Sequence, residues 1–155
     1  GHTIVDLHTD HHGVNPAELQ HLQGLDRVLV TPSHQYPSGG SLSGSRRVAL
    51  TSWAQHTNTV IIEDDFDSEL RYVGQPLPAL AALAPDHTVL LGTFSSVLSP
   101  ALACGYIVAP ARLLLALTRL REALGPSTRS PSIWPPALYD AAPSGYAGFI
   151  AVDAT

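Results

Sequence analysis

Three apolar runs of the sequence end in side chains that can carry chemistry. His34 lies in the segment after RVLV, Asp64 closes TVIIED, and Ser96 lies in GTFSS, which follows TVLL. A carboxylate and an imidazole can act together as proton carriers, and a serine hydroxyl can act as a nucleophile when a base activates it. Ser96 has no histidine near it in sequence and no Gly-x-Ser-x-Gly elbow, so a structural hydroxyl is the simpler interpretation.

The chain contains eight arginines and no lysine. A coding bias toward Ala, Pro, Gly and Arg accounts for this absence, but the chemical consequence holds whatever its origin. No side chain here can form a Schiff base. The one cysteine, Cys104, excludes an intramolecular disulfide and fits a reducing cytoplasm. Its place just before an apolar strand favours a small, inert side chain.

Apolar periodicity predicts strands that alternate with helices along the chain. The predicted strands are residues 3–7, 27–31, 59–63, 88–94 and 105–109, and the predicted helices are residues 16–22, 43–56 and 111–124, with one or two turns within 75–84. Most of these strands are continuous apolar runs, which are typical of a buried sheet. We therefore expect an α/β fold, a three-layer mixed and mostly parallel sheet flanked by helices, with a site at the carboxyl ends of the strands.

Composition limits the partners. A length of 155 residues, with 45% hydrophobic and 14% charged residues, indicates one ordinary globular domain. The net charge of −5 argues against a nucleic-acid surface, so we expect no direct nucleic-acid contact by this chain. No apolar stretch reaches the length that spans a bilayer, so we expect no membrane partner.

Four phrases, in matching order and spacing, resemble the fold-type I aminotransferase-like domain of MocR-type transcription regulators of the GntR superfamily. They are TPSHQYPSG (31–39), IIEDDFDSELRY (61–72), PLPAL (76–80) and GTFSSVLSPALACGY (92–106). Several phrases together are more specific than one short motif. The resemblance covers roughly residues 5–124 and implies part of the large domain of a pyridoxal-phosphate (PLP) fold. It also implies that the rest of that domain would precede residue 1 and a small domain would follow residue 155.

The resemblance assigns roles to residues that the family shares. Asp64 takes the position of the aspartate that keeps the pyridine nitrogen protonated, so that the ring acts as an electron sink. Thr93 and Ser95 take the positions of hydroxyls beside the cofactor phosphate. Tyr36 lies where aminotransferases outside this subfamily commonly place an asparagine near the ring.

Three other family positions have changed. Phe66 replaces the tyrosine that hydrogen-bonds the ring hydroxyl, Ser96 replaces the Schiff-base lysine, and Cys104 replaces the arginine that clamps the phosphate. An arginine–phosphate contact contributes about 1.5–3 kcal/mol for each charge-assisted hydrogen bond. These losses predict that PLP does not bind covalently, and we expect no cofactor.

Two polar clusters raise the question of metal binding. DLHTDHH puts Asp6, His8 and Asp10 on one face of a predicted strand, a set that zinc could use. A D-x-x-G turn over residues 10–13, with histidines facing solvent, is the simpler interpretation. The phrase EDDFDSE (63–69) has acids that could bind Mg²⁺, but the family phrase already accounts for them. We therefore predict no metal site.

Functions of two classes remain open. The first is a degenerate, PLP-independent module for binding, regulation or dimerisation. The second is a repurposed enzyme that catalyses a cyclisation, isomerisation or dehydration, in which Asp64 and His34 are the proton carriers. Burial without a pyridinium to face would raise the pKa of Asp64, although an Asp64 capped by backbone amides is the plainer alternative. A third possibility is an excised effector domain of a MocR-type regulator.

The resemblance also suggests an organisation and partners. We expect a truncated large domain over residues 1–124 and a Pro-rich extension over residues 125–155, in a cytoplasmic protein. The expected partners are a small-molecule ligand or substrate in the vacated cleft and a second copy of the chain, because the family domain dimerises. Four leucines share one face of the last predicted helix, which would lie in the core or an interface: Leu113, Leu114, Leu117 and Leu120.

Overall fold

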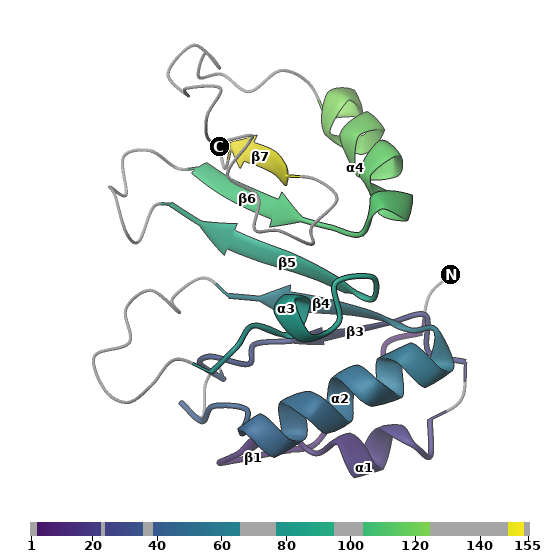
Figure 1. Cartoon of the computed structure of the whole chain (residues 1–155), viewed down its shortest axis with the longest axis vertical. Coiled ribbons are helices and arrows are strands. Elements are labelled where there is room, and N and C mark those ends of the chain that lie inside the picture. The colour runs from purple at the N-terminus through teal and green to yellow at the C-terminus, as the bar shows by residue number, and fades with distance from the viewer. Residues whose placement is uncertain are drawn as a thin grey trace.

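Five strands form one mixed sheet in the order β3-β4-β5-β6-β7 (Figure 1). The computed structural model describes residues 3–22, 24–35, 39–65, 77–94, 104–124 and 149–153. The strands are β3 (Arg27–Val30), β4 (Val60–Asp64), β5 (Thr88–Thr93), β6 (Cys104–Val108) and β7 (Phe149–Asp153). The first three strands are parallel, whereas β6 is antiparallel to both β5 and β7. The predicted α/β fold with a mixed sheet is confirmed.

The helices begin where the sequence provides caps. The side chain of Asn15 accepts a hydrogen bond from the Ala17 amide at the start of α1 (Pro16–Leu19), and Ser43 caps α2 (Gly44–Thr57) in the same way. Asn58 ends α2 in the left-handed conformation, with φ at 55°. Two further helices, α3 (Leu80–Leu83) and α4 (Ala111–Ala123), follow β4 and β6 along the chain.

The core lies between α1, α2 and one face of β3 and β4. Along β3 the side chains alternate, so that Val28 and Val30 are buried and Leu29 is exposed. Ile61 of β4 and Leu50 of α2 are fully buried in the same cluster. Helix α4 has no buried residue, so its leucine face lies outside this core.

The N-terminal segment differs from the prediction. Residues 3–7 form no strand, and the chain instead makes a short hairpin of β1 (Thr9–Asp10) and β2 (Gly13–Val14). The amide of His12 donates to Oδ1 of Asp10 inside the turn, at 2.7 Å. Gly13 has a φ of 89°, and a Cβ there would meet Leu42, so this position requires glycine. The predicted D-x-x-G turn is present, but the expected strand before it is not.

The C-terminal part contributes a strand that the sequence did not suggest. β7 pairs with the whole of β6, from Cys104 opposite Asp153 to Val108 opposite Phe149. The division of the chain at residue 124 stays a prediction, although β7 shows that part of the expected extension belongs to the sheet. No helix in the described ranges is long and apolar enough to cross a bilayer.

Candidate functional site

The segments that follow β3, β4 and β5 all begin at the carboxyl edge of the parallel part of the sheet. Val30 of β3 lies opposite Glu63 of β4, and Asp64 lies opposite Leu91 of β5. Because β3, β4 and β5 run in the same direction, the segments that follow them leave from one edge. His34, Asp64 and Thr93 therefore belong to one side of the molecule, as predicted.

Cys104 also lies at this edge. It begins β6, and its neighbour Gly105 pairs with Thr93 at the end of β5. The rings of Phe94 and Tyr106, which flank that pair, lie 5.0 Å apart between centroids. The fold thus brings together the backbone positions of Asp64, Thr93 and Cys104. Four other predicted site residues lie outside the described residues: Tyr36, Phe66, Ser95 and Ser96.

The buried carboxylate of the EDD phrase is Glu63 and not Asp64. Asp64 is half-buried at the end of β4, whereas Glu63 is fully buried beneath α2. The expectation of a buried Asp64 was wrong because strand alternation turns Glu63 toward the helices and Asp64 toward the opposite face. The next residue, Asp65, donates its amide to the Leu91 carbonyl at 2.9 Å, and its Oδ1 is buried without a hydrogen bond from the described residues.

Glu63 and Arg47 form a buried cluster that joins β4, α2 and α3. The two carboxylate oxygens accept the amides of Leu80 and Ala81, each at 2.9 Å, and Oε1 lies 4.0 Å from Nη1 of Arg47. The Arg47 guanidinium also donates to three backbone carbonyls at 2.9–3.0 Å: those of Pro32, Leu42 and Pro78. We call these seven residues the buried cluster.

The electrostatics of the buried cluster follow from its burial. Desolvation raises the pKa of Glu63, and the two amides that it accepts offset part of that rise. The pairing of Arg47 with three carbonyls satisfies a charge that would otherwise be costly to bury. Sequence reasoning missed this cluster. The available signal was the helical spacing, which places Arg47 on the same face as Leu50, Thr51 and Ala54.

The histidine-rich segment is organised by an ion pair. Arg46 makes a bidentate contact with Asp10, with both nitrogen–oxygen distances at 2.7 Å, and it also donates to the Gly13 carbonyl at 2.8 Å. The Arg46 guanidinium and then the His12 amide lower the pKa of Asp10 to about 2. We call this contact the hairpin clamp. No group of three metal-ligating side chains comes together within the described residues, which include all of DLHTDHH.

Known proteins resemble this chain in sequence and in fold. The pyridoxine biosynthesis transcriptional regulator PdxR of Corynebacterium glutamicum is 58% identical over 125 residues, which are 81% of this chain and 27% of PdxR. The regulatory protein MocR of Rhizobium meliloti is 39% identical over 87 residues, which are 56% of this chain and 18% of MocR. The chain is a relative of the MocR-type regulators. No family model matches it.

The fold of this chain resembles that of aminotransferases. The crystal structure of LysN, the α-aminoadipate aminotransferase of Thermus thermophilus with bound N-(5'-phosphopyridoxyl)-L-leucine, matches with a TM-score of 0.72 at 27% identity. The match covers 77% of this chain and 32% of LysN. The predicted resemblance to an aminotransferase-like domain of MocR-type regulators is therefore confirmed. The chain spans about a quarter of the length of PdxR.

The residues of this chain do not fit a covalently held PLP. The sequence has no lysine, so none of its side chains can form the imine. Two of the eight arginines are already engaged, Arg46 with Asp10 and Arg47 with buried carbonyls. Of the positions that the resemblance assigns to cofactor contacts and that keep the family residue, Asp64 and Thr93 lie among the described residues.

Proposed function

We propose that the chain is a PLP-independent, aminotransferase-like regulatory module that binds a small molecule at the carboxyl edge of the sheet and self-associates. The observation that carries this proposal is the absence of lysine from a chain whose relatives are transcription regulators. Regulation requires a binding site and a response, whereas transamination requires the imine. Cys104, at the position to which the resemblance assigns the phosphate arginine, supports the same proposal.

The ligand site would use groups that the edge already presents. Asp64 is half-buried there, and the buried Oδ1 of Asp65 is an acceptor that an N–H or O–H group of a ligand would satisfy. These acceptors favour a ligand that carries hydrogen-bond donors or a positive charge. A matched pair of variants, Asp64→Asn and Asp65→Asn, would separate the contribution of each carboxylate to binding.

The decisive experiment is a PLP titration followed by equilibrium dialysis. We compare the unmodified chain with Ser96→Lys, and Ser99→Lys provides a lysine in the same phrase at the wrong position. We expect no red-shifted imine band and no retained cofactor in the unmodified chain. Retention of PLP by this chain without the imine band would contradict the proposal and indicate non-covalent sensing of PLP.

The Ser96→Lys variant then separates two causes of a negative result. If the imine band appears in Ser96→Lys but not in Ser99→Lys, lysine replacement alone removed the cofactor. If neither variant binds PLP, the replacements at positions 66 and 104 also matter. The triple variant Phe66→Tyr, Ser96→Lys, Cys104→Arg tests that explanation directly.

Self-association through α4 is the second part of the proposal. Leu120, on the predicted leucine face, and Leu124, four residues later, are 58% and 82% exposed, and the described structure buries no residue of this helix. An exposed apolar helix face is typical of an interface between copies. We expect sedimentation velocity to show a dimer that Leu120→Asp weakens, while Val48→Asp on α2, at a site 56% exposed, leaves it unchanged.

The acid–base enzyme is the competing function. Its support is that β3 and β4 are neighbouring parallel strands, so the exits that carry His34 and Asp64 leave the same edge. If a reaction is found for a small organic substrate, Asp64→Asn should abolish it while the circular dichroism spectrum stays native. Full activity in that variant would exclude Asp64 as a proton carrier.

A further inference from the structure

Helix α3 is a single turn that takes its N-terminal cap from another element. Its own cap residue, Ala79, makes no side-chain hydrogen bond to the turn. The first amides of the turn, those of Leu80 and Ala81, instead donate to the two carboxylate oxygens of Glu63 on β4, each at 2.9 Å. The start of α3 is therefore held by a side chain of the sheet.

Two further contacts hold this segment. Nη1 of Arg47 donates to the Pro78 carbonyl at 3.0 Å, one residue before the cap. The Thr88 hydroxyl lies 3.5 Å from the Leu80 carbonyl, which is long for a hydrogen bond. A helix of four residues is not stable on its own, because too few hydrogen bonds repay the cost of starting it. The helical form of α3 thus depends on its docked position.

The docking of α3 covers a charge. Leu80 and Ala81 are fully buried, and so is Glu63 beneath them. Desolvation raises the pKa of Glu63, and the two amides offset only part of that rise. Leu80 belongs to the core cluster, so its burial favours the docked position. The docked position therefore balances a gain in apolar burial against the cost of keeping Glu63 away from water.

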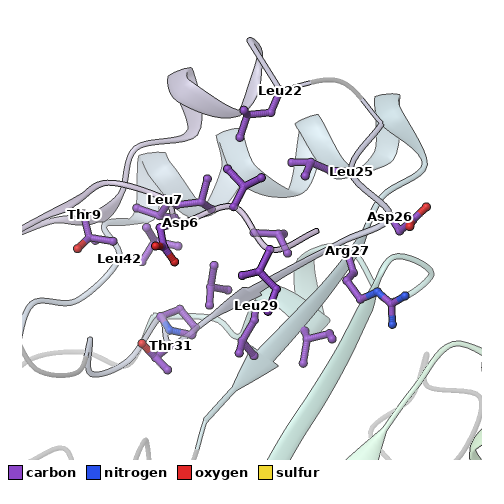
Figure 2. Close-up of a pocket in the computed structure, with 18 of the residues that line it drawn as sticks. Asp6, Leu7, Thr9, Leu22, Leu25, Asp26, Arg27, Leu29, Thr31 and Leu42 are labelled. Carbon is purple, nitrogen blue, oxygen red and sulfur yellow. The ribbon is translucent and has the colours of Figure 1, made fainter. Parts of the chain in front are cut away.

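The charged groups that face Glu63 come from two elements. Arg47 of α2 supplies the cation, with Nη1 4.0 Å from Oε1, and Asp65, just after β4, adds a negative charge on the same face of the strand. The sequences of α3 and β5 contain no titratable side chain. Arg27, the one charged residue of β3, is exposed and lines a cavity beside residues 3–7 (Figure 2). Glu63 is therefore the titratable group that directly contacts α3.

We propose that α3 is a conformational switch, which undocks from β4 as a unit while the core of α1, α2, β3 and β4 stays folded, and that ionisation of Glu63 makes it undock more often. Undocking returns the carboxylate to water and exposes the Leu80 and Ala81 amides to solvent. Elements that open in this way are typically held by few contacts. The proposal concerns the buried cluster and holds whether or not a ligand binds at the carboxyl edge.

The direction of the pH effect follows from the raised pKa of Glu63. In the docked state Glu63 holds its proton more tightly than in the undocked state, where it meets water. Docking is therefore strongest below pH 4.5 and weakens as the pH rises through the raised pKa.

Native-state hydrogen exchange of the whole chain, followed by NMR, tests whether α3 opens separately. We expect the Leu80 and Ala81 amides to exchange through an opening about tenfold more frequent than the one that exposes the Ala54 amide inside α2. That opening should change little with low concentrations of urea, because it exposes little surface. Exchange of all three amides through one shared opening would overturn the proposal, since α3 would then open only with the whole fold.

The pH dependence tests the role of Glu63. After correction for the intrinsic exchange rate, protection of the Leu80 amide should fall as the pH rises from 4.5, by about tenfold for each unit by which the pKa of Glu63 is raised. In Glu63→Gln this fall should disappear, whereas Glu18→Gln, on exposed α1 surface, should keep it. An unchanged fall in Glu63→Gln, or none in the unmodified chain, would overturn the proposal.

A variant that strengthens α3 completes the test without loss of the fold. Ala79→Ser places a hydroxyl at the cap position, where φ is −57° and ψ is 150°, outside the helical region. Because a serine cap stabilises a helix start, we expect the opening to become about fivefold less frequent. Ala82→Ser, at an exposed position inside the same turn, is the matched control and should not reduce the opening. Equal effects of the two variants would contradict the proposal, because α3 would then not be limited by its missing cap.

Discussion

Arg46 and Arg47 are neighbours in the sequence but belong to two different kinds of interaction. Arg46 reaches across the surface to Asp10 and fixes the hairpin, with its side chain 21% exposed and that of Asp10 46% exposed. Arg47 is only 1% exposed and joins three loop carbonyls to the buried Glu63. The comparison teaches that two consecutive residues of a helix can belong to a screened ion pair and to a buried cluster on which the packing depends.

The largest expected effect comes from Arg47→Ala. Its removal takes away the cation that lies 4.0 Å from Glu63 and the donor that serves three carbonyls, and loss of one partner from a buried pair costs about 3–5 kcal/mol. We expect the free energy of unfolding in urea, followed by circular dichroism, to fall by this amount. Arg47→Lys, which keeps the charge but loses the planar fork, should lose less. A loss no larger than that of Arg46→Ala would show that the two arginines are equivalent.

Glu63→Gln should have an intermediate effect. The amide keeps one acceptor for the Leu80 and Ala81 amides but turns an N–H group toward the other, which costs about 1–3 kcal/mol. The measurement is again urea unfolding, at pH 7, with Glu18→Gln as the exposed control. An unchanged free energy of unfolding would mean that the two amides do not need the carboxylate.

The difference in unfolding free energy between the unmodified chain and Glu63→Gln should depend on pH. Because the folded pKa of Glu63 is raised above 4.5, the folded state holds the proton more tightly than the unfolded state. This contribution to stability is present below pH 4.5 and is lost as the pH rises through the folded pKa. The unmodified chain should therefore lose stability relative to Glu63→Gln as the pH rises from 4.5. A difference that is flat with pH would contradict the raised pKa.

Arg46→Ala should have the smallest effect at neutral pH, because the hairpin clamp is exposed. Its signature lies at acidic pH. The folded pKa of Asp10 is lowered from 3.8 to about 2, so its contribution is present above 3.8 and is lost as the pH falls toward 2. In Arg46→Ala the Asp10 carboxyl should titrate closer to 3.8, as followed by NMR. An Asp10 pKa that stays near 2 would assign the shift to the His12 amide.

The sequence predicted the elements that carry their own local signals. Helix α2 has a serine cap and a long periodic pattern, and its predicted bounds of 43–56 lie within one residue of those observed. β3, β4 and β5 are apolar runs between turn residues, and they were placed correctly. These features depend on neighbours within one turn or one strand, which is the range that pattern reasoning covers.

The remaining features depend on partners far away in the chain. Residues 3–7 have the apolar character of a strand, but a strand needs a paired neighbour, which the structure does not give them. β7 has its partner in β6 more than forty residues earlier, so composition alone hid it. The role of Arg47 depends on carbonyls at positions 32, 42 and 78, from separate loops. The functions of Asp64, His34 and Ser96 stay predictions.

The buried cluster has a consequence for how such a chain can change over generations. None of its seven residues is among the positions to which the family assigns cofactor contacts, although Glu63 directly precedes Asp64. Mutations at positions 66, 96 and 104 therefore leave this source of stability untouched. A domain built in this way can lose an inherited chemistry one residue at a time and still be retained as a folded scaffold, open to selection for another use.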